Sequence, residues 1–165
     1  MNIMAHQTLI KRDLPDKKLY VTREFNAPLE KVWGAWTKSD LLDKWWAPKP
    51  WKAVTKTMDF TKGGIWFYYM FGPTGEKHFS RAIFSDIVPQ QTFSYECKFC
   101  DEEGNTNDDM PAMYWHNEFM STPSGSKVEV TLSFDSEAGI MKIIEMGFEG
   151  GFTMGLSNLD ELLEA

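Results

Sequence analysis

The stretch that most restricts the possible folds runs from Lys52 to Phe134, where alternating or aromatic runs are separated by turn residues. The strand-like runs are residues 52–60, 65–71, 77–88, 91–99, 113–122 and 127–134. Lys62-Gly63-Gly64 and the Pro-Ser-Gly-Ser segment at 123–126 are typical hairpin turns. Because strands joined by short turns pair antiparallel, this stretch predicts about six antiparallel strands.

Helical patterns lie on both sides of these strands. After a first strand over residues 19–25, apolar residues recur at helical spacing at Leu29, Val32, Trp33 and Trp36. A second short helix is expected from Ser39 until Pro48 ends it. Near the C-terminus, apolar residues repeat every three or four positions, and we expect one helix over 149–163. One long helix facing one sheet is an α+β arrangement, with the short helices at one end of a strongly curved sheet.

Three glycines interrupt the C-terminal helical pattern, at positions 150, 151 and 155. Each lowers helix propensity by up to about 1 kcal/mol relative to alanine. That cost indicates a purpose, either close approach of the helix to its neighbours or room for a ligand.

The length of 165 residues is typical of one domain with a sizeable core. Residues 1–17 are polar and contain Pro15, so we expect a flexible N-terminal leader followed by a single domain over 18–165. The leader region has no apolar stretch of signal-peptide length, which favours a cytoplasmic location.

Charge and hydropathy argue against two classes of partner. The formal net charge is −7, whereas nucleic-acid binding rewards clustered Lys and Arg. No apolar run approaches the roughly 20 residues that a membrane-spanning helix needs. We therefore expect neither nucleic acid nor a membrane as a partner, and a monomer or weak dimer.

The only cysteines, Cys97 and Cys100, form a single C-x-x-C without a second pair. On a regular strand, positions three apart point to opposite faces, so we expect two unconnected thiols with neither metal nor disulfide. The acidic segment 101–109 matches no EF-hand spacing and is expected to be a solvated loop. No catalytic motif or cofactor fingerprint occurs, so neither catalytic residues nor a cofactor are predicted.

Several motifs together resemble one family. The likeness rests on four segments of the chain. They are REFNAPLEKVWGAWTKSDLLDKWWAP at 23–48, the D-x-x-x-G-G-x-W-x-Y-x-M pattern at 59–70, Ile-Val-Pro at 87–89, and the Gly-Phe, Gly and Leu-Asp run over 151–162. The chain resembles the activator of heat-shock protein 90 ATPase homologue-like family of the START-like (SRPBCC, Bet v allergen-like) superfamily over residues 18–164. Ala47 stands where the family usually has glycine, and Leu156 where tryptophan is common.

This resemblance implies the helix-grip fold, a curved antiparallel sheet wrapped around the long C-terminal helix with an apolar cavity between them. The tryptophan-rich segment KWWAPKPW at 44–51 would form a collar after the second helix. Its tryptophans either cover the core only or also contact a ligand.

Strand alternation and the family pattern suggest which side chains face the cavity. The candidate ligand-binding residues are Trp66, Tyr68, Met70, Phe93, Tyr95, Trp115, Asn117, Phe119, Phe152 and Leu156. Asn117 is the polar member; it would orient a ligand, or else pair with neighbouring strands or a water. His116 has the opposite parity and is expected to point outward.

The leading functional prediction is non-enzymatic binding of a small hydrophobic or amphipathic molecule between the sheet and the C-terminal helix. Two alternatives stay open. Some START-like relatives are cyclases or hydrolases, and the family resemblance also implies a chaperone as a possible protein partner. Function does not follow from fold alone, so the site must decide.

Overall fold

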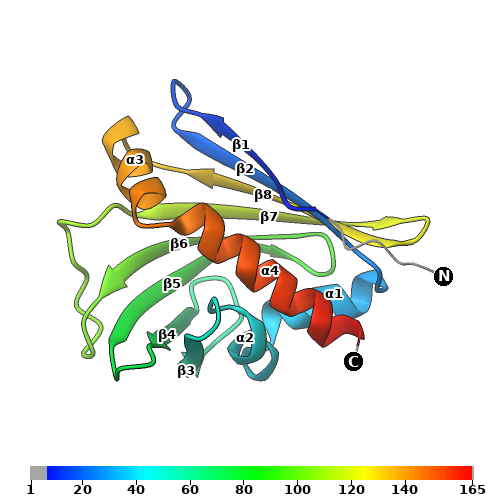
Figure 1. Ribbon diagram of the computed structural model, residues 1–165, viewed down its shortest axis with the longest axis horizontal. Helices are drawn as coiled ribbons and strands as arrows, with labels where there is room; N and C mark the ends of the chain where they lie inside the picture. Colours follow the sequence, from blue (N-terminus) through cyan, green and yellow to red (C-terminus); the bar gives the residue numbers. More distant parts are fainter. Residues whose placement is uncertain (1–6, 165) are drawn as a thin grey trace.

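A computed structural model of the chain describes residues 7–164. Its centre is an eight-stranded sheet with the order β1-β2-β8-β7-β6-β5-β4-β3 (Figure 1). The strands are β1 (Leu9–Asp13), β2 (Lys18–Phe25), β3 (Lys52–Met58), β4 (Ile65–Phe71), β5 (Lys77–Val88), β6 (Thr92–Cys100), β7 (Met113–Thr122) and β8 (Gly125–Ser133). Every neighbouring pair is antiparallel. The predicted antiparallel run from β3 to β8 is confirmed.

The helices are α1 (Leu29–Thr37), α2 (Ser39–Trp45), α3 (Glu137–Glu145) and α4 (Phe148–Glu164). Figure 1 shows α4 crossing the face of the curved sheet from α3 at one end to α1 at the other. This arrangement confirms the predicted helix-grip fold. Within residues 7–164, no helix combines the length and the apolar character needed to cross a membrane.

The predicted flexible leader over residues 1–17 is wrong for Leu9–Asp13, which form β1 and pair with β2. The two short helices therefore follow the second strand, not the first. β1 is an edge strand whose residues are mostly exposed, so its sequence carries charges and shows no apolar alternation. Residues 1–6 lie outside the described part of the chain.

One of the C-terminal glycines lets α4 approach α2. A Cβ atom on Gly155 would lie 3.2 Å from the carbonyl oxygens of both Trp45 and Trp46. Beside it, the Asn158 side-chain amide donates to the Ala47 carbonyl at 3.1 Å. Close approach is thus the reason for this glycine, since a larger side chain would push the helix off the end of α2.

The segment 44–51 begins with the last two residues of α2 and ends directly before β3, where it forms the predicted collar. Trp45 is buried and its indole N–H donates to the Ala35 carbonyl at 2.9 Å. Trp46 is also buried and donates to the Tyr68 hydroxyl at 3.1 Å. Trp45 therefore joins α2 to α1, whereas Trp46 joins the collar to the inner face of β4.

Candidate ligand-binding cavity

A cavity of about 240 Å³ lies between the inner face of the sheet and the start of α4. Its sheet wall comes from β4 to β7 and includes Tyr68, Met70, Ser80, Cys97 and Trp115. The antiparallel register brings these residues together: Tyr68 lies opposite Ser80, and Cys97 opposite Met113, which also lines the cavity. The wall is thus built by side chains from four consecutive strands.

The opposite wall belongs to the helices and the collar. Phe148 and Phe152 of α4 and Trp46 of the collar line the cavity from one side, and Ile143 and Met146 cover it near the end of α3. Gly147, with φ of +88°, turns the chain between α3 and α4. Because this left-handed conformation favours glycine, the turn that places both helices over the cavity depends on it.

The rim of the cavity is open to solvent. His78, Met146 and Gly147 line it and are exposed in the folded chain. His78 lies opposite Met70 in the β4–β5 register and its ring stands 5.1 Å from that of Trp51. A small molecule would therefore enter between the β4–β5 hairpin and the α3–α4 turn.

The polar groups inside the cavity are uncharged at neutral pH. Burial raises the pKa of the Tyr68 phenol well above its ordinary value. Burial likewise raises the pKa of the Cys97 thiol to about 12. Ser80 is buried beside them, so the interior offers hydroxyl, thiol and indole groups and no ionised side chain.

The two cysteines should differ in reactivity with iodoacetamide at neutral pH. The thiolate is the nucleophile, and burial raises the pKa of Cys97 to about 12. Burial also raises the pKa of Cys100 at the strand end, but the nearby Arg81 charge opposes that rise. We expect Cys100 to be alkylated first, as followed by peptide mass spectrometry, with equal rates in denaturant as the control. Faster modification of Cys97 in the folded protein would contradict this placement.

The other end of the sheet-helix space is filled by aromatic rings from α1. Trp33 stands 5.6 Å from Phe93 and 4.9 Å from Phe119, and Trp36 stands 5.7 Å from Phe119 (centroid distances). Edge-to-face contacts of this kind close the space that the strand pattern left open. The inner face of the sheet is therefore packed at the α1 end and hollow at the α3 end.

Four of the predicted ligand-binding residues line the cavity: Tyr68, Met70, Trp115 and Phe152. The other six were predicted to line the cavity, but the structure places them away from its wall: Trp66, Phe93, Tyr95, Asn117, Phe119 and Leu156. All six are buried. For the five on strands, parity gives the face and not the end of the sheet, and Leu156 lies on α4, past the part of the helix that lines the cavity.

Trp46 also lines the cavity, in agreement with the second of the two roles expected for the tryptophans of segment 44–51. Other lining residues were not predicted, among them His78, Ser80, Cys97, Ile143, Met146 and Phe148. Cys97 alternates with Phe93 and Tyr95, so its inward face was readable from the sequence. Ile143 and Met146 had no comparable signal, because their place depends on the turn at Gly147.

Asn117 is fully buried in the packed end, between Phe93 of β6 and Val130 of β8 in the strand register. Neither its amide nitrogen nor its amide oxygen has a hydrogen-bond partner among the described residues. The Asn117 side chain therefore forms no hydrogen bond to the neighbouring strands among the described residues, in contrast to one of the two alternatives. A role for Asn117 in orienting a ligand stays a prediction.

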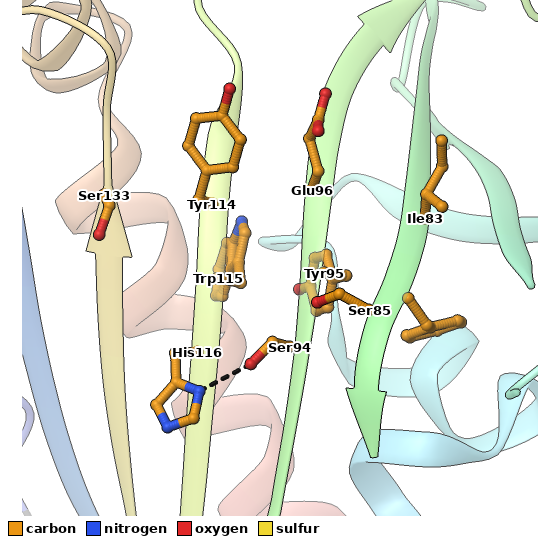
Figure 2. Close-up of a pocket in the computed structure, with 10 residues that line it drawn as sticks. Ile83, Ser85, Ser94, Tyr95, Glu96, Tyr114, Trp115, His116 and Ser133 are labelled. Atoms are coloured by element: carbon orange, nitrogen blue, oxygen red, sulfur yellow. Dashed lines mark hydrogen bonds between the residues drawn. The ribbon is translucent and has the colours of Figure 1, made fainter. Parts of the chain in front are cut away.

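The outer face of the sheet carries a second hollow of about 400 Å³, shown in Figure 2. There the Ser94 hydroxyl and His116 Nδ1 lie 2.7 Å apart, and His116 Nε2 lies 3.1 Å from a Glu118 carboxylate oxygen. His116 points outward, as predicted, and its side chain is 45% exposed. Since Ser94 and His116 are direct cross-strand neighbours on a solvated face, strand pairing explains this chain of hydrogen bonds.

Comparison with known proteins adds the following findings. A family model described as "Activator of Hsp90 ATPase homolog 1-like protein" matches residues 26–164. A crystal structure of a Mycobacterium smegmatis protein is 28% identical, with 94% of this chain and 96% of that chain covered and a TM-score of 0.88. A solution structure from Arthrobacter aurescens is 28% identical over 94% of this chain and 91% of that one, with a TM-score of 0.90. No curated protein matches the chain.

Proposed function

The chain belongs to the activator of Hsp90 ATPase homolog 1-like family, and from this premise we propose that it binds a small hydrophobic or amphipathic molecule without transforming it. The proposed site is the cavity between β4–β7 and the start of α4. The START-like helix-grip fold is a ligand-binding type of domain in general, which supports this reading. The observation that best supports ligand binding is the cavity itself, which lies at one end of an otherwise packed interior.

Protein interiors are normally close-packed, and a void forfeits dispersion contacts along its whole lining. The space of about 240 Å³ exceeds the roughly 150 Å³ of an engineered apolar cavity that binds benzene. Its walls are mainly aromatic and aliphatic, with Met70, Phe148 and Phe152 among them. A bicyclic or similarly sized apolar molecule would recover the missing contacts.

Enzymatic function is less well supported by the same cavity. Acid-base or nucleophilic catalysis needs groups whose pKa values lie near the operating pH. Tyr68 and Cys97 both have raised pKa values, with burial as the main cause, so both stay protonated. The family's description refers to the Hsp90 ATPase, so a chaperone remains the alternative partner to a small molecule, and no feature of the cavity favours it.

The test uses 2-isopropenylnaphthalene, a neutral bicyclic hydrocarbon, as the probe. Binding to the native state alone should raise the melting temperature, because a ligand at 100 times its dissociation constant adds about 2.7 kcal/mol. Ser80→Phe should abolish the rise by filling the cavity from the sheet wall. Ser85→Phe, the same change on the exposed side of β5, should leave it intact.

Two results would contradict the proposal. One is an unchanged melting temperature of the wild-type protein at saturating probe, checked by the absence of amide shifts in a titration followed by nuclear magnetic resonance. The other is full binding by a folded Ser80→Phe variant, which would place the probe outside this cavity.

A further inference from the structure

The Trp115 indole N–H is a buried hydrogen-bond donor that the fold leaves unused. Trp115 is 4% exposed, lines the cavity, and its Nε1 atom has no hydrogen-bond partner among the described residues. In Figure 2 this nitrogen lies at the end of the ring nearest Tyr114. Met113, the first residue of β7, also lines the cavity.

Other tryptophans of the core have partners for the same group. The indole N–H groups of Trp45, Trp46 and Trp66 donate to oxygen atoms at 2.9, 3.1 and 3.1 Å. The indole N–H of Trp36 likewise has no hydrogen-bond partner within residues 7–164, but Trp36 does not line the cavity. Leaving a buried donor unsatisfied is costly, so an unpaired one at a cavity wall marks a place for an acceptor.

The direction of the Trp115 N–H is fixed by packing. The indole stacks on Tyr95 with centroids 5.5 Å apart and planes 15° apart. Phe152 meets it edge-on at 5.4 Å and Trp46 lies 5.4 Å away. A donor held on three sides by rings is oriented before any ligand arrives, which lowers the entropic cost of binding.

The remaining polar groups of the cavity also suit an uncharged acceptor. The Tyr68 hydroxyl accepts from Trp46 at 3.1 Å and also interacts with Ser80 and Cys97, so it is an uncharged group with partners inside the protein. Ser80 lies opposite Tyr68 in the strand register. No Lys or Arg is among the described residues that line the cavity, so an anionic ligand would lose its hydration without a cation to compensate for it.

We propose that the ligand is an uncharged, mainly apolar molecule whose carbonyl or ether oxygen accepts a hydrogen bond from Trp115 Nε1. This inference rests on the proposed function, because it assumes that the cavity is the ligand site. It adds the chemical class of the ligand and the residue that selects it.

The test compares two neutral probes of nearly the same shape, 2-acetylnaphthalene and 2-isopropenylnaphthalene, which differ by an oxygen in place of a methylene group. If the cavity offered no hydrogen-bond donor, the ketone should bind more weakly than the alkene, because its oxygen would lose its hydrogen bonds to water and gain none in the protein. We expect instead that the ketone binds at least as tightly. Trp115→Phe should weaken ketone binding about tenfold, which corresponds to about 1.4 kcal/mol, and change alkene binding less than about twofold.

Trp36→Phe is the matched control, because it removes an unpaired indole that does not face the cavity. A second readout needs no variant: the indole proton of Trp115 in the wild-type spectrum should move downfield with the ketone and not with the alkene. The anion 2-naphthoate should bind at least about tenfold more weakly than the ketone.

The possible failures are distinguishable. If neither neutral probe binds the wild-type protein, the proposed function fails and the inference with it. If both bind while the Trp115 indole proton responds to neither, or Trp115→Phe weakens both equally, the inference alone is overturned. Binding of 2-naphthoate as tight as that of the ketone would overturn the restriction to uncharged ligands.

Discussion

Replacing Phe152 with alanine is expected to lower the free energy of unfolding by about 3–5 kcal/mol. Phe152 is 6% exposed and joins α4 to every neighbouring layer. Its ring lies 5.4 Å from Trp115 of the sheet, 5.9 Å from Trp46 of the collar and 6.3 Å from Trp36 of α1. These large rings are held by their own contacts and cannot collapse into the gap, so the cost includes the cavity left behind.

Met154→Ala is the matched control on the same helix. Met154 is 43% exposed, so removing its side chain takes little apolar surface out of the core. Urea unfolding followed by circular dichroism would measure both variants, with the slope against denaturant checked for constancy. Equal stability losses in the two variants would show that α4 is not gripped as the structure describes.

The fold was largely predictable from the sequence, because alternating apolar residues along the strands identify the buried face of the sheet. Trp66 and Tyr68 on β4 lie on the predicted side and are buried, and the alternating Val128, Val130 and Leu132 of β8 are buried as well. The edge strand β1 was missed for the opposite reason. Leu9–Asp13 gain their order mainly from main-chain pairing with β2, which leaves no apolar pattern in their side chains.

The sequence predicted that the cavity lies between the sheet and the C-terminal helix, but not at which end of the sheet it lies. Phe93 and Trp115 both point inward, yet only Trp115 meets the hollow, because Trp33 of α1 packs on Phe93. Which end of the sheet is filled depends on where a separate helix inserts its rings. That is a long-range packing outcome, and neither strand parity nor helix periodicity contains it.

The family likeness likewise predicted that there is a cavity but not which polar group lies at its wall. It implied a cavity between the sheet and the C-terminal helix, where the structure has one, whereas strand alternation led to Asn117 as the polar member of that cavity. The structure instead offers Trp115, a residue predicted as part of the apolar wall, as the unpaired donor at the hollow. A polar atom on a mostly apolar side chain is easily overlooked in sequence, since its role depends on which neighbours fail to pair with it.

Asp160→Ala is expected to destabilise the protein by about 3–5 kcal/mol, because it breaks a largely buried ion pair from one side. The Arg23 guanidinium of β2 is 3% exposed and is paired with the Asp160 carboxylate of α4. It also donates to the Thr8 hydroxyl at 2.8 Å, which does not neutralise its charge. Arginine cannot shed its proton in the folded state, so the variant must bury an uncompensated cation.

Glu161→Ala gives a matched comparison one residue along the same helix. Glu161 pairs with Lys49 at 3.0 Å, but the two side chains are 71% and 62% exposed, and such pairs contribute about 0–1 kcal/mol. The double replacement Arg23→Met with Asp160→Leu separates the cost of an orphaned charge from the value of the pair. If burial of the lone guanidinium causes the loss, the double variant should recover most of it in urea unfolding. A double variant as unstable as Asp160→Ala would mean that the pair itself holds α4 against β2, since removing both charges would then bring no relief.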